Sequence, residues 1–296
     1  MALTLQPRYL KVVIRLQSGS FNFTDADTVT FDGKEGFRMS FEGSQNGGLS
    51  GFYGHVMIWG VTQDVMDRIF VQNYMALDKY SNFITVYATD DDGEYSIVYN
   101  GLITQAMPDY MGMPDVPLII DAVTNLEMAL SKPAPDSYAG VVSISSMAKK
   151  IATDMGLSFE NNGVDGNLTD EYLPGSTLDK LKKLSEDAAF DYYFDISGKI
   201  LAICPRGKPR ASTQIKVNVS TGLIGYPSKT IMGVAFTHLY SSALQMGIPI
   251  YIDSDLKPCV GQWFIFAMNY MLDCNVPNGA WHIHAQASPS QYVVTR

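Results

Sequence analysis

The chain has 296 residues, 46% of them hydrophobic, which is enough for two or three domains with cores of their own. It contains no apolar run of about 18 residues and no basic-then-apolar start, so we expect neither a transmembrane helix nor a signal peptide, and folding in the cytoplasm. The net charge of −9 is divided into −9 over residues 1–130, −4 over 131–205 and +4 over 206–296, which leaves the first two thirds without the basic surface of a nucleic-acid-binding protein.

Residues 1–130 are predicted to be mainly β. Alternating or β-branched segments separated by Gly and Asp predict strands over residues 8–16, 27–33, 35–43 and 54–60. A short helix is predicted over residues 62–70, with Thr62 as N-cap and with Val65, Ile69 and Phe70 on one side. Residues 82–107 predict two strands around an acidic Asp-Gly turn, and residues 116–124 predict a strand that closes the set.

The composition changes near residue 130, where Pro133 and Pro135 favour an extended linker. A helix is predicted over residues 143–155, with an inner face made of Ile144, Met147, Ala148, Ile151 and Met155. A second helix is predicted over residues 177–190, capped by Ser176 or Thr177, with Asp179 in its first turn and with an inner face made of Leu178, Leu181, Leu184, Ser185 and Ala188. Residues 191–205 predict a hairpin that turns at Ser197 and Gly198.

The segment "PRGKPR", residues 205–210, forms the second junction, and strands are predicted after it over residues 213–219, 233–240, 248–253, 262–272 and 280–287. The fold class is therefore mainly β with an α+β insert. The predicted domains are residues 1–130, 131–205 and 206–296, two β modules of similar size around a small α/β module. The similar size of the two β modules indicates a repeated architecture.

His282 and His284 are the first candidates for a metal site, because alternation along a strand places both imidazoles on one face. Zinc needs a third or fourth ligand, which His55, His238, Asp273 or Cys274 could supply in principle. No ligand spacing supports this, so we interpret the pair as a polar strand face beside a buried Trp281 and predict no metal ligands.

The acidic residues give two further candidates. "TDDDGEY", residues 89–95, clusters carboxylates as a calcium loop does, but Asp90, Asp91 and Asp92 are consecutive, which favours a solvated hairpin tip. The pairs Glu186/Asp187 and Asp191/Asp195 could form a hydrolase dyad, but helix ends and hairpins carry such acids routinely.

Other signs of catalysis or of cofactor binding are missing from the sequence. The glycine-rich "NNGVDGN", residues 161–167, has neither dinucleotide-binding nor P-loop spacing and is predicted to be a loop. The serine-containing segments "YSSALQMG" and "VSISSMAKK" lack a placed base, and no nucleophile elbow occurs. We therefore predict no catalytic residues, no cofactor and no enzymatic activity.

Two features of composition indicate the environment of the protein. Cys204, Cys259 and Cys274 have no metal or redox spacing and are predicted to be reduced, buried hydrophobic residues. The chain also holds 17 Tyr, 14 Phe, 15 Met and 3 Trp, residue types that are enriched at protein interfaces. This surplus indicates a subunit that buries much of its surface against partners.

Several segments between residues 143 and 287, about half of the chain, occur in an order and spacing that resemble the baseplate hub proteins of bacteriophages with contractile tails. These segments are "FENNGV" after a short strand, "YLPGS" at a helix start, the hairpin that ends in "ICPRG", "TGLIGYPS" before a strand, the "LYSSAL" loop and "PNGAW" before the last strand. The first 130 residues resemble the family mainly in their plan. The chain departs from the family at "HIH", which is usually less polar, and near Cys259, where a small residue is usual.

The resemblance implies two tail-tube-like β-barrel domains flanking a small α/β domain, and assembly into a homotrimer whose six barrels form a ring. The implied partners are the tail tube protein, the central spike protein, other baseplate proteins and the tape measure protein. DNA would be present only in transit through the lumen, and no membrane insertion is implied. The implied location is the tail baseplate of the virion. The alternatives are a tail-tip enzyme such as a cell-wall hydrolase, and a tail tube or tube-initiator subunit.

Overall fold

The computed structural model describes residues 7–16, 27–46, 52–70, 82–90, 92–196, 198–210 and 213–289. The first part of this chain is mainly β, as predicted, and alternating burial along its strands places apolar side chains on one face. Helix α1 (Gln63–Ile69) lies between β4 and β5, and the strands are β1 (Leu10–Leu16), β2 (Asp27–Asp32), β3 (Met39–Asn46), β4 (Tyr53–Trp59), β5 (Phe83–Thr89), β6 (Tyr95–Pro108) and β7 (Pro117–Val123).

The last part of the chain is also β, and its strands are β15 (Ile215–Val217), β16 (Leu223–Thr230), β17 (Gly233–Leu239), β18 (Pro249–Ile252), β19 (Gly261–Cys274) and β20 (Trp281–Ser288). The sequence did not predict β16, because Gly225 and Pro227 interrupt its apolar pattern. Pairing with β17 forms this strand, and its register shifts between Ile224 and Ser228. Such a shift marks a β-bulge, and a bulge at the edge of a sheet accommodates Gly225 and Pro227.

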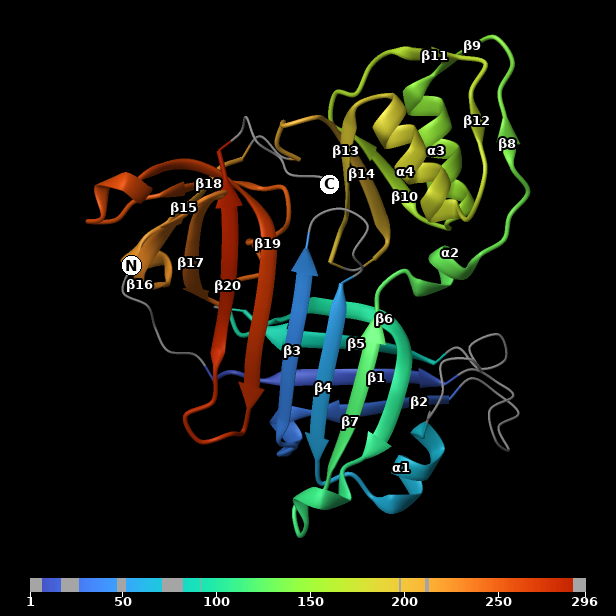
Figure 1. Cartoon of the computed structure of the whole chain (residues 1–296). Helices are drawn as coiled ribbons and strands as arrows, with labels where there is room; N and C mark the ends of the chain where they lie inside the picture. Colours follow the sequence, from blue (N-terminus) through green and yellow to red (C-terminus); the bar gives the residue numbers. More distant parts are fainter. Residues whose placement is uncertain are drawn as a thin grey trace.

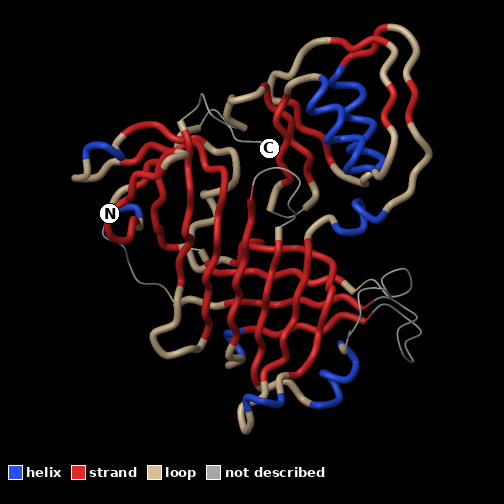
Figure 2. Tube along the Cα trace, in the orientation of Figure 1, coloured by secondary structure: helices blue, strands red, loops and turns tan. Residues whose placement is uncertain are grey.

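The two β regions are joined into one sheet, which the sequence did not predict. The strands are hydrogen-bonded in the order β16-β17-β20-β19-β3-β4-β7-β6-β5-β1-β2, and β18 and β15 extend from β19. The joint lies between β3 and β19, which pair antiparallel from Asn46 opposite Ala267 to Met39 opposite Cys274. In Figure 1 β20, β19, β3, β4 and β7 lie side by side, and β1, β2 and β5 cross behind them; Figure 2 shows the same grid of strands.

One apolar core runs beneath both β regions, and aromatic rings pack at its centre. The ring of Tyr99 contacts Phe52 edge to face at 4.9 Å, and Phe52 in turn lies 5.4 Å from the ring of Tyr270. Gly54 makes room for this cluster, because a Cβ atom there would lie 2.7 Å from Cζ of Tyr99. The joint between β3 and β19 is therefore held by shared packing as well as by backbone hydrogen bonds.

The middle of the chain forms a small α/β unit with a separate apolar core. Helices α3 (Ile144–Asp154) and α4 (Thr177–Asp187) pack on a three-stranded sheet of order β10-β14-β13. The strands of this unit are β8 (Asp136–Ser137), β9 (Val141–Ser143), β10 (Ser158–Asn161), β11 (Asn167–Thr169), β12 (Tyr172–Leu173), β13 (Phe190–Phe194) and β14 (Ile200–Pro205). Figure 1 shows the unit beside one end of the large sheet. The exact division at residues 130 and 205 stays a proposal.

Helix α4 begins and ends for local reasons. Ser176 is its N-cap, in a capping box with Asp179, which confirms one of the two predicted caps. The prediction that the helix continues to Phe190 was wrong, because Ala189 adopts a left-handed φ of 53° and Phe190 begins β13. The inner face also includes Lys180, which was not predicted and is only 2% exposed.

Two other predictions of side-chain position were partly wrong. In α1 Met66 and Ile69 are buried, whereas Phe70 follows the helix and is 47% exposed. Thr62 is the N-cap residue but makes no side-chain capping bond. The face of α3 is buried as predicted, except that Ala152 is fully buried and Met155 only partly. None of the described helices is long and apolar enough to span a membrane.

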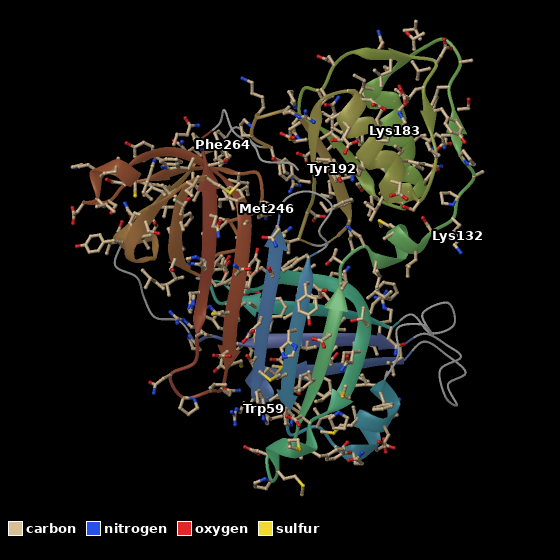
Figure 3. All side chains as sticks on the ribbon, in the orientation of Figure 1. Trp59, Lys132, Lys183, Tyr192, Met246 and Phe264 are labelled. Carbon is tan, nitrogen blue, oxygen red and sulfur yellow. The ribbon has the colours of Figure 1, made fainter. Side chains whose placement is uncertain are left out.

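The connection between the first β region and the small unit is extended, as its prolines predicted, and is held on the small unit. Lys180 donates from Nζ to the backbone oxygen of Ala134 at 2.6 Å and to Oδ2 of Asp136 at 2.8 Å. On the other side the small unit contacts the second β region, because the ring of Tyr193 lies over Gly247. Arg210 of the junction lies 3.4 Å from Glu160 of the small unit and donates from its backbone N to Gly247 O. Figures 1 and 3 show this connection, which consists of α2 (Leu126–Leu130) and the residues that follow it up to Lys132, labelled in Figure 3.

Candidate assembly surfaces

The strands that form the outward face of the large sheet lack basic residues. Eight adjacent strands, β17, β20, β19, β3, β4, β7, β6 and β5, contain no lysine or arginine, although the chain has 21 of these residues. Their acidic residues are Glu42, Asp121 and Asp273. A surface that crosses the joint between the two β regions is therefore free of fixed positive charge within its strands.

Cross-strand pairing aligns polar side chains in rows on this face. One row runs through five successive pairings and comprises His282, Met271, Glu42, His55, Asp121 and Gln105, all of them polar except Met271. All six side chains are partly or fully exposed. Beside this row an open hollow is lined by Glu42, Ser44, Tyr53, His55, Asn269 and Met271. Most of these side chains can contact a partner through hydrogen bonds, and none of them is a lysine or an arginine.

Asp121 organises the centre of the face. Its Oδ1 atom accepts a hydrogen bond of 2.6 Å from the hydroxyl of Tyr53 and lies 2.7 Å from Nδ1 of His55. Burial, and then the hydrogen bond to Asp121, raise the pKa of Tyr53 to about 12, so this phenol stays a donor at neutral pH. In the described part of the chain no serine, threonine or cysteine is bonded to His55, so this imidazole has no paired hydroxyl or thiol nucleophile there.

The candidate metal residues lie apart from one another. His282 and His284 share the outward face of β20, while Trp281 and Ile283 are buried on the other face. His55 lies three strands away from β20, and His238 is buried with its Nδ1 2.6 Å from the backbone oxygen of Leu239.

The other two candidate ligands are engaged elsewhere. Asp273 accepts hydrogen bonds from Ser40 and from the Ala280 amide, and Cys274 is buried near Phe37. The described residues contain no group of three or more potential metal ligands. The expectation that no metal binds stays a prediction.

The acidic hairpin between β5 and β6 forms the predicted tip, but Asp90 has an additional contact. Its Oδ2 atom accepts a hydrogen bond from the Ser242 amide at 3.0 Å and a second one from the Ser242 hydroxyl. Asp91 lies outside the described residues. Asp90 therefore links the first β region to the loop that follows β17.

The two acid pairs proposed as a dyad have separate contacts. Asp187 pairs with Lys183, whereas Glu186 lies 4.0 Å from Lys182. Asp191 is 1% exposed and accepts from the Gly207 amide at 2.9 Å.

Asp195 follows the other end of β13 and accepts from the amides of Lys199 and Ile200 in the hairpin turn. Four residues of extended chain separate Asp191 from Asp195 by about 13 Å. That separation is larger than the spacing of the carboxylates in known glycosidase pairs.

All three cysteines are free and buried, as predicted. Burial raises the pKa of Cys204 to about 12, and burial also raises the pKa of Cys274. Thiols with such environments are poor nucleophiles. The loop predicted over residues 161–167 is confirmed for residues 162–166, whereas Asn161 ends β10 and Asn167 begins β11. Asn161 shapes the loop by accepting from the amides of Gly163 and Val164.

Sequence reasoning missed Asp121, Tyr53 and the buried Lys180. Alternation along β4 and β7 could have placed Tyr53, His55 and Asp121 on outward faces, but the register that brings them together depends on strand pairing. For Lys180 the helical spacing from Thr177 and Leu184 was a signal, which its charge concealed.

Comparison with known proteins gives one family and a set of similar structures. The sequence model of the family described as Baseplate hub gp41 matches residues 67–276, which is more than half of the chain. No curated protein matches the sequence significantly.

Solved structures share the fold at low sequence identity. The 43 kDa tail protein of prophage MuSo2 from Shewanella oneidensis is 8% identical with a TM-score of 0.59, over 94% of this chain and 97% of that chain. The tail protein from Neisseria meningitidis MC58 is 9% identical with a TM-score of 0.60, over 95% and 96%. The E. coli c3393 protein, a component of the type VI secretion system, is 12% identical with a TM-score of 0.54, over 85% and 73%.

Proposed function

The chain belongs to the Baseplate hub gp41 family, and from this premise we propose that it forms a homotrimeric ring that joins the tail tube of a phage to its central spike. The family is one of structural tail proteins, and its place is the tail of the virion. The proposed ring has two tube-like β regions from each chain, so that three chains supply six comparable regions around one axis.

The Lys- and Arg-free face of the large sheet is the observation that carries this proposal. A channel for DNA must not bind phosphate, because each lysine or arginine on its wall would release counterions and add affinity. The side-by-side strands β20, β19, β3, β4 and β7 carry this face across the joint of β3 with β19, so one chain supplies a continuous arc of it. We propose that this face lines the lumen.

The proposed partners are the central spike protein, the tail tube protein, other baseplate proteins and the tape measure protein. DNA contacts the ring only in transit, the chain does not insert into a membrane, and synthesis takes place in the host cytoplasm. A chain of a Francisella PdpA-VgrG complex is a further structure of similar fold, 8% identical with a TM-score of 0.52, over 98% of this chain and 59% of that chain. That likeness supports a shared fold, and the spike partner stays a proposal from the family.

Light scattering of the purified protein at several concentrations, with and without its cognate spike, tests the ring. We expect a mass of three chains, favoured by high concentration and by the spike, because a partner that binds only the assembled state stabilises it by mass action. A chain that stays monomeric at saturating spike would contradict the proposal.

Retention on duplex DNA at low salt tests the lumen wall. The natural protein should pass a DNA column, whereas a variant with Ser44→Lys and Asn269→Lys, both on the outward face, should be retained and released by salt. The matched control carries Ser44→Gln and Asn269→Gln and should pass. Strong retention of the natural protein would argue against this face as the channel wall.

A further inference from the structure

Exposed apolar side chains are concentrated in two patches. Of the 16 large apolar side chains that are exposed in the described residues, seven lie between residues 219 and 256 and four lie directly after α1 or in the loop between β6 and β7. Scattered single apolar residues are normal on a surface, but contiguous ones indicate an interaction site.

The first patch lies on the edge strand β16 and beside η5 (Lys257–Cys259), and we call it the basic patch. It comprises Ile224, Tyr226, Lys229, Ile231, Leu256 and Lys257. Lys229 lies over the ring of Trp263, with Nζ 4.4 Å from its centroid. Neither Lys229 nor Lys257 is within ion-pair distance of a carboxylate in the described part of the chain, whereas nearby Lys216 is neutralised by Asp253 at 2.9 Å.

The backbone of β16 suits contact through side chains better than addition of a further strand. Pro227 has no amide hydrogen, and the register shift between Ile224 and Ser228 interrupts the edge. A Cys259 thiol contact to Pro227 O, at 3.6 Å, fixes this bulge against η5. Tyr226, 72% exposed, and Ile231, fully exposed, then project from a fixed backbone.

The second patch lies on α1 and on η3 (Tyr110–Gly112), and we call it the acidic patch. It comprises Asp64, Asp67, Phe70, Tyr110, Met111 and Met113. The loop is held in place, because Asp109 accepts from the Met111 amide at 3.0 Å and Tyr110 donates to Oε1 of Gln63 at 3.2 Å. Met111 is nevertheless 95% exposed, so its apolar side chain is offered to a partner by a backbone that binding does not have to order.

The two patches face different ways and carry opposite charge. In Figure 1 β16 lies at the far left, whereas α1 lies at the lower right and η3 at the bottom. Figure 3 labels Trp59 near this lower end, where Arg38 stacks over its ring at 4.2 Å. One chain can therefore offer its acidic patch to one neighbour and its basic patch to another.

We propose that the acidic patch of one copy docks on the basic patch of the next copy. The occupant is a second copy of this chain because the complementary apolar surface and the complementary charge are both present in the same sequence. Apolar side chains at the centre supply burial, and Lys229 and Lys257 opposite Asp64 and Asp67 set the register. Such a contact is heterologous and closes into a ring when its rotation allows. Closure at three copies rests on the proposed function.

Crosslinking between two introduced thiols tests the contact. Phe70→Cys, 47% exposed, labels the acidic patch, and Ile224→Cys, 43% exposed, labels the basic patch. The native cysteines are buried and do not compete. With a flexible bismaleimide, the chain with both substitutions should give covalent species of up to three chains. Either single variant should stay a single chain, and a mixture of the two single variants should give two-chain species and nothing larger.

Two controls separate this contact from random collision. A variant that combines Ile224→Cys with Tyr172→Cys should give no covalent species of two or three chains. Tyr172 is 52% exposed and lies on the small unit, away from the acidic patch. Lys229→Glu with Lys257→Glu, added to the variant with both thiols, should lower the crosslinked yield several-fold, as should high salt. Circular dichroism and tryptophan fluorescence confirm that each variant is folded.

The contact is overturned if a single variant crosslinks to itself as well as the double variant does. Crosslinked species larger than three chains that need both thiols would keep the contact and contradict closure at three copies. The contact is also overturned if the double variant yields no crosslinks at concentrations where light scattering shows three chains. In that case the proposed ring stands, but its chains meet through other surfaces. If instead the natural chain stays monomeric with its spike and the double variant gives no crosslinks, both the ring and the contact are wrong.

Discussion

The hydroxyl of Ser40 donates a hydrogen bond of 2.6 Å to Oδ1 of Asp273, across 233 positions of sequence. The two residues face each other where β3 pairs with β19. Asp273 also accepts from the Ala280 amide at 2.8 Å, so one carboxylate fixes both the joint and the turn before β20. This joint makes one sheet of two β regions that the sequence presented as separate.

Asp273→Ala is expected to loosen that joint. The change leaves the Ser40 hydroxyl and the Ala280 amide without their acceptor, and Ser40 is 8% exposed, so we expect unfolding free energy to fall by about 1–3 kcal/mol. Urea unfolding followed by tryptophan fluorescence measures this, since Trp281 pairs with Leu272 of β19, next to Asp273. Asp255→Ala, on an exposed loop, is the matched control and should change stability by less than about 0.5 kcal/mol. Equal effects of the two variants would contradict the assignment.

Gly54→Ala is expected to disturb the aromatic centre of the core. The added Cβ would lie 2.7 Å from Cζ of Tyr99, a ring that is completely buried, so the core must shift and stability should fall by about 1–3 kcal/mol. Thermal unfolding measures the change. Gly112→Ala is the control, because its nearest neighbour would be Pro117 Cδ at 3.4 Å. A melting temperature for Gly54→Ala equal to that of the control would show that the Tyr99 side chain moves aside without loss of stability.

The stability of the small unit is expected to depend on pH through Asp136. Burial alone would raise the pKa of Asp136, but hydrogen bonds from Lys150 and Lys180 outweigh it and leave the pKa lowered. A lowered folded-state pKa gives stability that is complete above the unfolded value of about 3.9 and is lost as the pH falls through the folded value. Stability should therefore decrease below about pH 4.

Urea unfolding followed by circular dichroism at 222 nm checks this, because α3 and α4 are the longest helices described. Asp136→Asn should destabilise the unit by about 2 kcal/mol or more at pH 7, since it leaves the ammonium of Lys180 buried without a full counter-charge. The difference from the natural protein should shrink at low pH. Asp165→Asn, in an exposed loop, is the control. A difference that stays constant from pH 7 to pH 3 would rule out Asp136 as the source.

Limited proteolysis is expected to release the small unit. The first cuts should fall near Lys132 or between Arg206 and Arg210, because Lys132 and Arg206 are exposed whereas Ala134 and Asp136 are held by Lys180. A protease of broad specificity is needed, since prolines follow Lys132 and Lys208 and block trypsin there. Mass spectrometry identifies the fragments. Cleavage confined to α4 would show that residues 131–205 are not a separable domain.

His282 and His284 are expected to hold no metal. Both lie on the outward face of β20, and no group of three or more potential ligands occurs in the described residues. Elemental analysis of protein purified without a histidine tag should find zinc, nickel and iron well below one per chain. One tightly bound metal per chain that disappears in a His284→Ala variant would prove the expectation wrong.

The sequence by itself determined the elements whose causes are local. Alternating apolar residues predicted β1, β4 and β5, and the capping box at Ser176 predicted the start of α4. Periodicity and capping act over a few residues, so they can be read from a short stretch of chain. The order β, α/β, β and the motifs between residues 143 and 287 also sufficed to indicate the family that residues 67–276 match.

Tertiary structure alone decided how those elements combine. Nothing near Ser40 specifies Asp273 as its partner, because the register of β3 on β19 follows from packing around Phe41 and Tyr270 over the whole core. In the same way Lys180 is buried only because Ala134 and Asp136 fold back on α4 and satisfy its charge. The row of polar residues that contains His55 and Asp121 likewise exists only after six strands have aligned, since contacts between distant segments depend on the fold as a whole.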